Sequence, residues 1–158
     1  MPNAAQLLLS GAIFTGVAAL LHVAIILGGP DWYRFFGAGE RMAQLAARGS
    51  AYPGIVTAGI AATLGVWMLY ALSGAGVIRR LPLLRLALVL IAAVYLLRGT
   101  LGVPVVLLVD DPYATELKAR MTFMAVSSVI CVCLGVCYAA GAAVVWQKSP
   151  GSERSVDR

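Results

Sequence analysis

Four long runs of apolar residues, separated by shorter polar stretches, dominate the pattern of this 158-residue chain. None of the runs alternates between apolar and polar positions, as the strand of a membrane β-barrel would. Each is near or above the ~20 residues that cross the hydrocarbon core of a bilayer as a helix. The pattern therefore predicts an all-α fold, an integral membrane bundle of four helices. We expect these helices at residues 5–27, 54–73, 84–109 and 112–146.

Composition agrees with the pattern, since 61% of the residues are hydrophobic and only 12% are charged. Soluble domains carry roughly 25% charged residues, so a water-soluble fold is excluded. The four helices account for most of the chain, and we predict a single transmembrane domain over residues 1–147. Residues 148–158 have the composition of a polar tail. The first run lacks a positively charged region in front of it and is predicted to be retained as a helix.

The basic residues predict the orientation of the bundle. On the side of the two ends and of the connection near residue 80, six basic residues stand against two acidic ones, and the opposite side has five of each. Because Lys and Arg favour the cytoplasmic side, we place both termini and the tail there, with the Arg79–Arg80 pair as an anchor. The net charge of +5 then indicates anionic lipid rather than nucleic acid as the partner.

The connection between the first two helices is long enough to have structure of its own. Gly28, Gly29 and Pro30 end the first helix, and the aromatic residues that follow are of the kind that settles at lipid headgroups. Between Gly39 and Gly49 the pattern predicts a short amphipathic interfacial helix. This helix either caps the bundle or forms a lid over a pocket. The aromatic residues are Trp32, Tyr33, Phe35 and Phe36.

The sequence of the third connection, near residues 110–120, predicts the start of a helix. Asp111 is a good N-cap, and Pro112 suits the first helical position. Glu116 and Arg120 are one helical turn apart, which predicts a surface ion pair between them.

Arg98 is the only charged residue between Leu86 and Val109. An arginine near the middle of a membrane helix costs about 2.5–3.5 kcal/mol on insertion scales, so it normally faces protein, water or an anion. Pro104 leaves the carbonyl of Thr100 without its helical partner, and Gly99 weakens the helix further, which predicts a kink or partial unwinding here. His22, the only histidine, is expected about 9 Å below the outer end of the first helix.

We predict a cavity open to the outer side, lined by Arg98 and His22 and by loop residues above them. Arg98 would supply a permanent positive charge, and His22 a proton or hydrogen bond that changes near neutral pH. The alternative is structural: Arg98 pairs with Glu40, Asp31 or exposed carbonyls, and His22 bonds to a neighbouring helix. The loop residues proposed for the ligand site are Glu40, Asp31, Tyr33 and Trp32.

The leading functional hypothesis is binding or transport of a small anionic solute or a lipid headgroup in this cavity. A second is a non-catalytic membrane subunit that assembles with itself or with another membrane protein through stripes of small residues. A third is an intramembrane enzyme that uses His22 with Glu40 or Asp31 as acid and base. The chain has no phosphate loop, metalloprotease motif or activated serine, so we predict no catalytic residue and no cofactor.

The cysteines do not form a metal or redox motif. Cys131, Cys133 and Cys137 fall on one helix without C-x-x-C spacing, and we expect them to pack as small hydrophobic residues.

Three segments, GGPDWYRFFGAGERMA, LYALSGAG and LPLLRLALVLIAAVYLLRG, resemble small bacterial inner-membrane proteins with four helices and no assigned activity. The resemblance implies a bacterial inner membrane and a four-helix layout. It carries no functional residues with it.

Overall fold

The chain is all-helical over residues 3–147, the part that its structure, a computed structural model, describes. Four long helices carry the apolar runs, and each is long and apolar enough to cross a membrane. This confirms the predicted all-α fold with four long apolar helices. They are α1 (Ala4–Gly28), α4 (Tyr52–Gly74), α5 (Leu84–Leu108) and α7 (Met121–Gln147). The predicted polar tail, residues 148–158, lies outside the described residues.

Three short helices lie in the connections, namely α2 (Pro30–Phe35), α3 (Glu40–Ala47) and α6 (Pro112–Lys118). Of these, α3 is the short helix predicted between the two glycines. The sequence analysis did not predict α2, which has Pro30 at its first position and ends after six residues. A helix of that length leaves almost no periodicity to detect.

The helix predicted over residues 112–146 is divided into α6 and α7. The backbone leaves the helical path at Ala119 and Arg120, while Asp111 caps α6 as predicted by accepting a hydrogen bond from the backbone N–H of Ala114 (2.6 Å). Because α6 ends at Lys118, Arg120 is not one helical turn beyond Glu116, and the predicted ion pair between them does not form.

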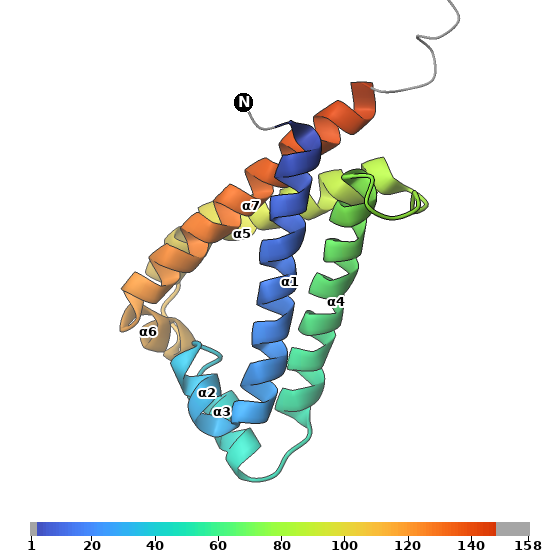
Figure 1. The fold of residues 1–158 in the computed structure, drawn as a ribbon. Coiled ribbons are helices and arrows are strands. Elements are labelled where there is room, and N and C mark those ends of the chain that lie inside the picture. The colour runs from blue at the N-terminus through green and yellow to red at the C-terminus, as the bar shows by residue number, and fades with distance from the viewer. Residues whose placement is uncertain (1–2, 148–158) are drawn as a thin grey trace, which may run out of the picture.

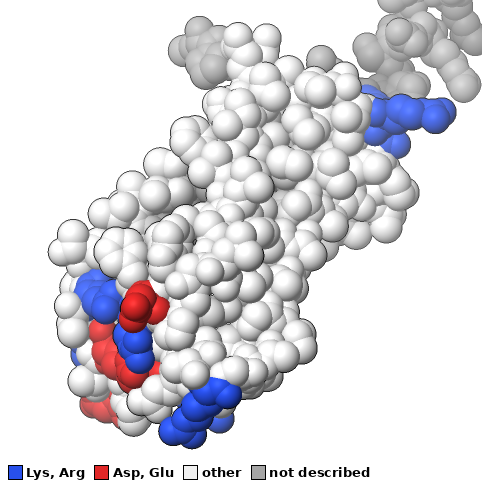
Figure 2. All heavy atoms as spheres, turned by 60° about the horizontal axis from the view of Figure 1, so that its bottom comes forward, with Lys and Arg blue, Asp and Glu red and all other residues white. Residues whose placement is uncertain are grey.

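The long helices form two pairs, α1 with α4 and α5 with α7 (Figure 1). The pairs pack together at the end where α1 begins, α7 ends and α4 connects to α5, which we call the terminal end. Towards the opposite end, the loop end, the pairs diverge, and α2, α3 and α6 lie there (Figure 1). Charged side chains gather at the two ends, with a broad uncharged band between them on the face in Figure 2.

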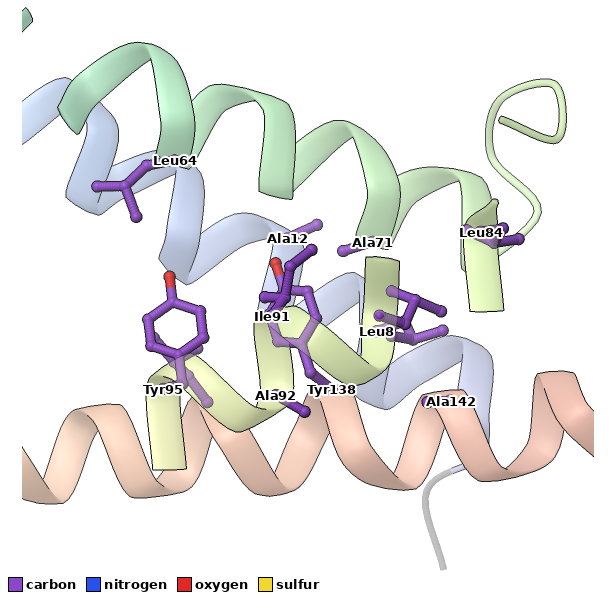
Figure 3. Packing of buried hydrophobic residues seen from close by; sticks show 12 residues of the cluster. Leu8, Ala12, Leu64, Ala71, Leu84, Ile91, Ala92, Tyr95, Tyr138 and Ala142 are labelled. Carbon is purple, nitrogen blue, oxygen red and sulfur yellow. The ribbon is translucent and has the colours of Figure 1, made fainter. Parts of the chain in front are cut away.

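The main hydrophobic core lies towards the terminal end and joins all four long helices (Figure 3). Leu8 and Ala12 of α1 are almost completely buried, as are Leu88 of α5 and Tyr138 of α7. Gly141 of α7 lacks the side chain that would collide with Leu8, so these two helices approach closely. Small residues on α7 therefore allow close packing, as the sequence analysis proposed.

A chain of hydrogen bonds joins the four long helices at the boundary of this core. The hydroxyl of Tyr138 donates to the backbone carbonyl of Trp67 on α4 (3.3 Å), so its oxygen accepts from Thr15 of α1 (3.1 Å). The single proton of Thr15 is then used, and the hydroxyl of Tyr95 on α5 donates to it (3.1 Å). Each long helix contributes one group, which sets the register between the two pairs.

Candidate functional site

Arg98 lies on α5 just beyond the hydrogen-bonded chain, on the way to the loop end. The predicted unwinding is absent, since α5 is helical without interruption from Leu84 to Leu108. Thr100 donates its hydroxyl hydrogen to the carbonyl of Leu96 (2.7 Å), and the helix accommodates Pro104 near its end. The arginine is thus presented by a regular helix and not by a break in the backbone.

Gly102 makes room for the guanidinium of Arg98. A Cβ atom at residue 102 would overlap Nη1 of Arg98 and would lie 3.2 Å from Oγ of Ser128 on α7. The arginine side chain therefore extends along α5 towards the loop end. Gly102 is seven residues after Tyr95, almost two full helical turns, so the guanidinium lies on the face of α5 that meets α1 and α4 closer to the terminal end.

Ser128 contributes a buried hydroxyl to the same position. The residue is 6% exposed, and its Oγ has no hydrogen-bond partner within residues 3–147. A buried polar group without a partner typically costs ~1–3 kcal/mol. Ser128 and Arg98 thus bring two hydrogen-bond donors without protein acceptors to one point beside Gly102.

The carboxylates that could have neutralised Arg98 bind another arginine instead. Arg34 of α2 makes a forked pair of hydrogen bonds to Glu40, with Nε–Oε2 at 2.8 Å and Nη2–Oε1 at 3.0 Å, and its Nη1 lies 3.0 Å from Oδ1 of Asp31. The alternative in which Glu40 or Asp31 pairs with Arg98 is therefore wrong. Arg34 is closer in sequence to both acids and reaches them within the loop end.

The remaining acidic side chains in residues 3–147 are also engaged. Asp110 binds Lys118 (2.9 Å), Asp111 caps α6, and Glu116 accepts a hydrogen bond from the backbone N–H of Glu40 (2.8 Å). In that part of the chain, Arg98 has no ion-pair or hydrogen-bond partner. Its charge is left for a group that the described protein residues do not supply.

His22 lies on α1, seven residues after Thr15. Seven residues are almost two full helical turns, so the two side chains share one face of the helix. Its Nδ1 is 2.7 Å from the carbonyl oxygen of Ala18 in its own helix. A carbonyl only accepts, so Nδ1 carries the hydrogen, and Nε2 is the ring nitrogen that remains for a ligand. The predicted bond to a neighbouring helix is not present.

The two aromatic loop residues proposed for the ligand site, Tyr33 and Trp32, differ in exposure. Tyr33 is 2% exposed and packs with Ile25 and Ala43 in a small core at the loop end, and its hydroxyl has no hydrogen-bond partner in the described part of the chain. The ring of Trp32 packs on Phe36, with 5.7 Å between the centroids, and is itself exposed. Trp32 is thus available at the surface, whereas Tyr33 fixes α2 against α1.

The residues of α6 connect Arg98 with the loop end. Tyr113 donates a hydrogen bond to the carbonyl of Gly37 (3.1 Å). Partial burial raises the pKa of Tyr113, and the positive charge of Arg98 opposes that shift. Tyr113, Glu40 and Glu116 also line a hollow of about 460 Å³ between α3 and α6.

Glu116 supplies the missing cap of α3. Gly39 precedes this helix and has no side chain to bond the first N–H groups, so the carboxylate of Glu116 binds the N–H of Glu40 from α6. A negative charge at a helix N-terminus is favourable. Arg120 donates in turn to the carbonyl of Phe35 (2.9 Å). These two bonds hold the connections of the two helix pairs together.

Acid is expected to loosen α2 and α3. The hydrogen bond from Arg34 lowers the pKa of Glu40 below its ordinary value. A lowered folded-state pKa means that the unfolded chain binds the proton first, so the pair stabilises the loop above the ordinary glutamate pKa of ~4.3 and loses this effect as pH falls through the lower, folded value. The fluorescence of Trp32, obtained by subtracting a Trp32→Phe variant, should report this change.

A Glu40→Gln variant should show a smaller acid-induced change in Trp32 fluorescence, since its loop is already loosened at neutral pH. Asp110→Asn is the matched control, because Asp110 binds Lys118 on α6 and not Arg34. An acid transition of equal size in Glu40→Gln and in the unchanged protein would contradict this assignment.

Among the predicted site residues, Asp31 and Glu40 come together in an ion cluster around Arg34. Arg98 lies on α5 with its guanidinium beside Gly102, and His22 lies on α1 with Nδ1 bonded to the carbonyl of Ala18. Sequence analysis did not include Arg34, although its position three residues after Asp31 was a usable signal.

The sequence pattern indicates a small packing residue at Ser128 and a point of helix weakness at Gly102. Nothing in the sequence pattern showed that both lie beside the guanidinium of Arg98.

Comparisons of the chain with protein-family models, with curated proteins and with solved structures gave no match.

Proposed function

We propose that this protein spans a bilayer with its four long helices and binds a small anion, a solute or a lipid headgroup, at Arg98. The observation that carries this proposal is the imbalance of charge around that residue. Every acidic side chain in residues 3–147 has a partner elsewhere, whereas Arg98 has none and lies beside the unpartnered hydroxyl of Ser128. An arginine in a membrane segment needs an anion or water, and the anion would come from outside the protein.

Such an anion could reach Arg98 directly, because its side chain is exposed. Beyond the hydrogen-bonded chain, side chains on the inner faces become partly exposed, as His22 on α1 and Cys131 on α7 show, and Arg98 is exposed. His22 offers Nε2 as a second ligand group, and Trp32 with the ion cluster of Arg34 forms the cover. The helix α3 would then lie in the membrane interface.

The charges support the orientation within the membrane. In the full sequence six Lys and Arg residues, the Arg79–Arg80 pair among them, belong to the side of the two chain ends, against five on the loop side, so the terminal end is assigned to the cytoplasm of a bacterial inner membrane. A reporter that is active only in the cytoplasm is expected to be active when it is fused after Arg158. A fusion that is active only outside the cytoplasm would reverse the assignment and place the Arg98 site on the inner side.

Anion binding is tested by thermal unfolding of the purified protein in an uncharged detergent. Inorganic phosphate is titrated in one series and water-soluble short-chain phosphatidylglycerol in another. A ligand at 100 times its Kd stabilises the folded state by about 2.7 kcal/mol, so a saturable rise in unfolding temperature is expected in at least one series. Phosphate alone indicates a solute, and the lipid alone a headgroup. No rise in either series would overturn the proposal.

A further inference from the structure

An apolar groove runs between α5 and α7 on the half of the molecule near the terminal end. Its walls consist mainly of alanines from both helices, so space remains that larger side chains would fill. The hollow has a volume of about 400 Å³, within the ~300–1,000 Å³ usual for ligand pockets. The principal lining residues are Ala92, Ala93, Ala139, Ala142, Ala143 and Trp146.

A second hollow, of about 390 Å³, continues the groove beyond Trp146, which lines both. Its walls include Arg80 and Arg85, and the guanidinium of Arg85 lies 5.9 Å from the centre of the Trp146 ring. From Leu96 in the first hollow to Leu84 in the second is twelve residues of α5, or about 18 Å along the helix. One continuous path therefore leads from an apolar channel to a basic mouth.

The start of α5 adds to the positive potential at this mouth. Leu83, the residue before the helix, has a left-handed backbone (φ 54°), and no side chain caps the first N–H groups of α5. Uncapped N–H groups at a helix N-terminus bind phosphate groups. The connection that precedes the helix is held in place by Ser73, which accepts a hydrogen bond from the N–H of Leu81 (2.9 Å) and donates one to the carbonyl of Arg79 (3.1 Å).

No acidic side chain of residues 3–147 lies at this end, where the charges drawn in Figure 2 are blue. Arg80 and the N–H groups in the first turn of α5 make the mouth suitable for an anion, and the alanine groove suits an unbranched apolar chain. A phospholipid with an anionic headgroup combines both parts in one molecule, and basic pockets between helices on the cytoplasmic side of membranes bind such lipids.

We propose that the groove between α5 and α7 binds an anionic phospholipid, with its phosphate at Arg80, Arg85 and the first turn of α5 and an acyl chain along the alanines. This inference rests on the membrane location proposed above but is independent of the Arg98 site. Trp146 lies at the junction of head and chain, so its fluorescence reports occupancy directly.

The test uses the full chain reconstituted in phosphatidylcholine vesicles, with flotation to establish insertion. Phosphatidylglycerol with brominated acyl chains is added in one series and brominated phosphatidylcholine in the other, because bromine quenches tryptophan fluorescence on contact. The signal of Trp146 is the difference between the unchanged protein and Trp146→Phe, so Trp32 and Trp67 cancel. Quenching of Trp146 is expected at an about 30-fold lower fraction of the anionic lipid, since the two arginines contribute ~1 kcal/mol each and ~1.4 kcal/mol corresponds to a factor of ten.

The double variant Arg80→Gln, Arg85→Gln should lose this preference, whereas Arg79→Gln, which does not line the hollow, should keep it. Ala143→Leu should reduce quenching by both lipids because its side chain fills the groove. Equal quenching by the two lipids would overturn the proposal. Protection of Trp146 from both lipids would also overturn it, in favour of a protein covering the groove.

Arg98→Leu should leave the Trp146 result unchanged, which separates this site from the anion site. A chain that does not float with vesicles would contradict the membrane location itself.

Discussion

Replacing Arg98 with leucine is expected to weaken anion binding by about 10- to 100-fold, because a hydrogen bond to a charged group contributes ~1.5–3 kcal/mol. The measurement is the shift in unfolding temperature with phosphate or short-chain phosphatidylglycerol. Insertion should be intact, since leucine costs nothing in an apolar helix and Arg98 makes no bond within residues 3–147 that its removal would break. Unchanged binding by Arg98→Leu would refute the site.

Arg48→Leu is the matched control for this substitution. Arg48 follows α3 at the loop end and is exposed, so it shares the charge and the side of the molecule but not the position on α5. Its anion binding should remain within about twofold of the unchanged protein, since a distant exposed charge is screened by salt. An equal loss in both variants would indicate that general positive charge, and not the Arg98 site, attracts the anion.

The Ser128→Ala variant tests whether the hydroxyl of Ser128 binds the anion or is only a buried polar group without a partner. If Ser128 donates to the anion beside Gly102, its removal lowers the affinity. If its hydroxyl only remains unpaired, alanine removes an unsatisfied polar group and raises the unfolding temperature without changing the affinity. The expected result is the loss of affinity, and a stabilised protein with full affinity would remove Ser128 from the proposed site.

Gly99→Ala is expected to lower the free energy of unfolding by about 1–3 kcal/mol, the range for overpacked interiors. A Cβ atom at this position would lie 2.8 Å from the carbonyl oxygen of Ser128 and 2.8 Å from the amide nitrogen of Val132. Both are backbone atoms of α7, which can give way only if the two helices separate. Thermal unfolding followed by circular dichroism in detergent measures the effect.

Gly59→Ala is the corresponding control on α4. It is also a glycine within a long apolar helix, but a Cβ atom there would meet nothing within 4 Å. Because alanine is the better helix former by ~1 kcal/mol, this variant should be as stable as the unchanged protein or slightly more stable. Equal destabilisation by Gly59→Ala and Gly99→Ala would show that loss of glycine, and not the approach of α7, is responsible.

The course of α5 shows why local signals were insufficient. Gly99, Gly102 and Pro104 predicted a break, yet the helix continues. The two glycines serve contacts that sequence spacing does not show: Gly99 faces the backbone of α7, and Gly102 faces the guanidinium of Arg98. A glycine weakens an isolated helix, but here the packing of α7 against α5 outweighs that preference.

The sequence by itself determined the four long apolar helices, the end of α1 at Gly28, the start of α6 after its cap Asp111, and the position of Arg98 as a single charge within an apolar helix. These features depend on length, on residue type and on neighbours within one helical turn, all of which are local. The sequence also predicted which charged connections lie at the same end of the bundle, because four successive helices place alternate connections at opposite ends.

Only the tertiary structure decided which charges meet. The choice of Arg34 over Arg98 as the partner of Asp31 and Glu40 depends on how α2 and α3 fold against each other. The chain of hydrogen bonds through Thr15, Tyr95 and Tyr138 joins residues far apart in sequence. Such contacts depend on the register of the two helix pairs and on how the pairs diverge. The apolar helices have nearly uniform surfaces, so neither property is determined until the helices pack.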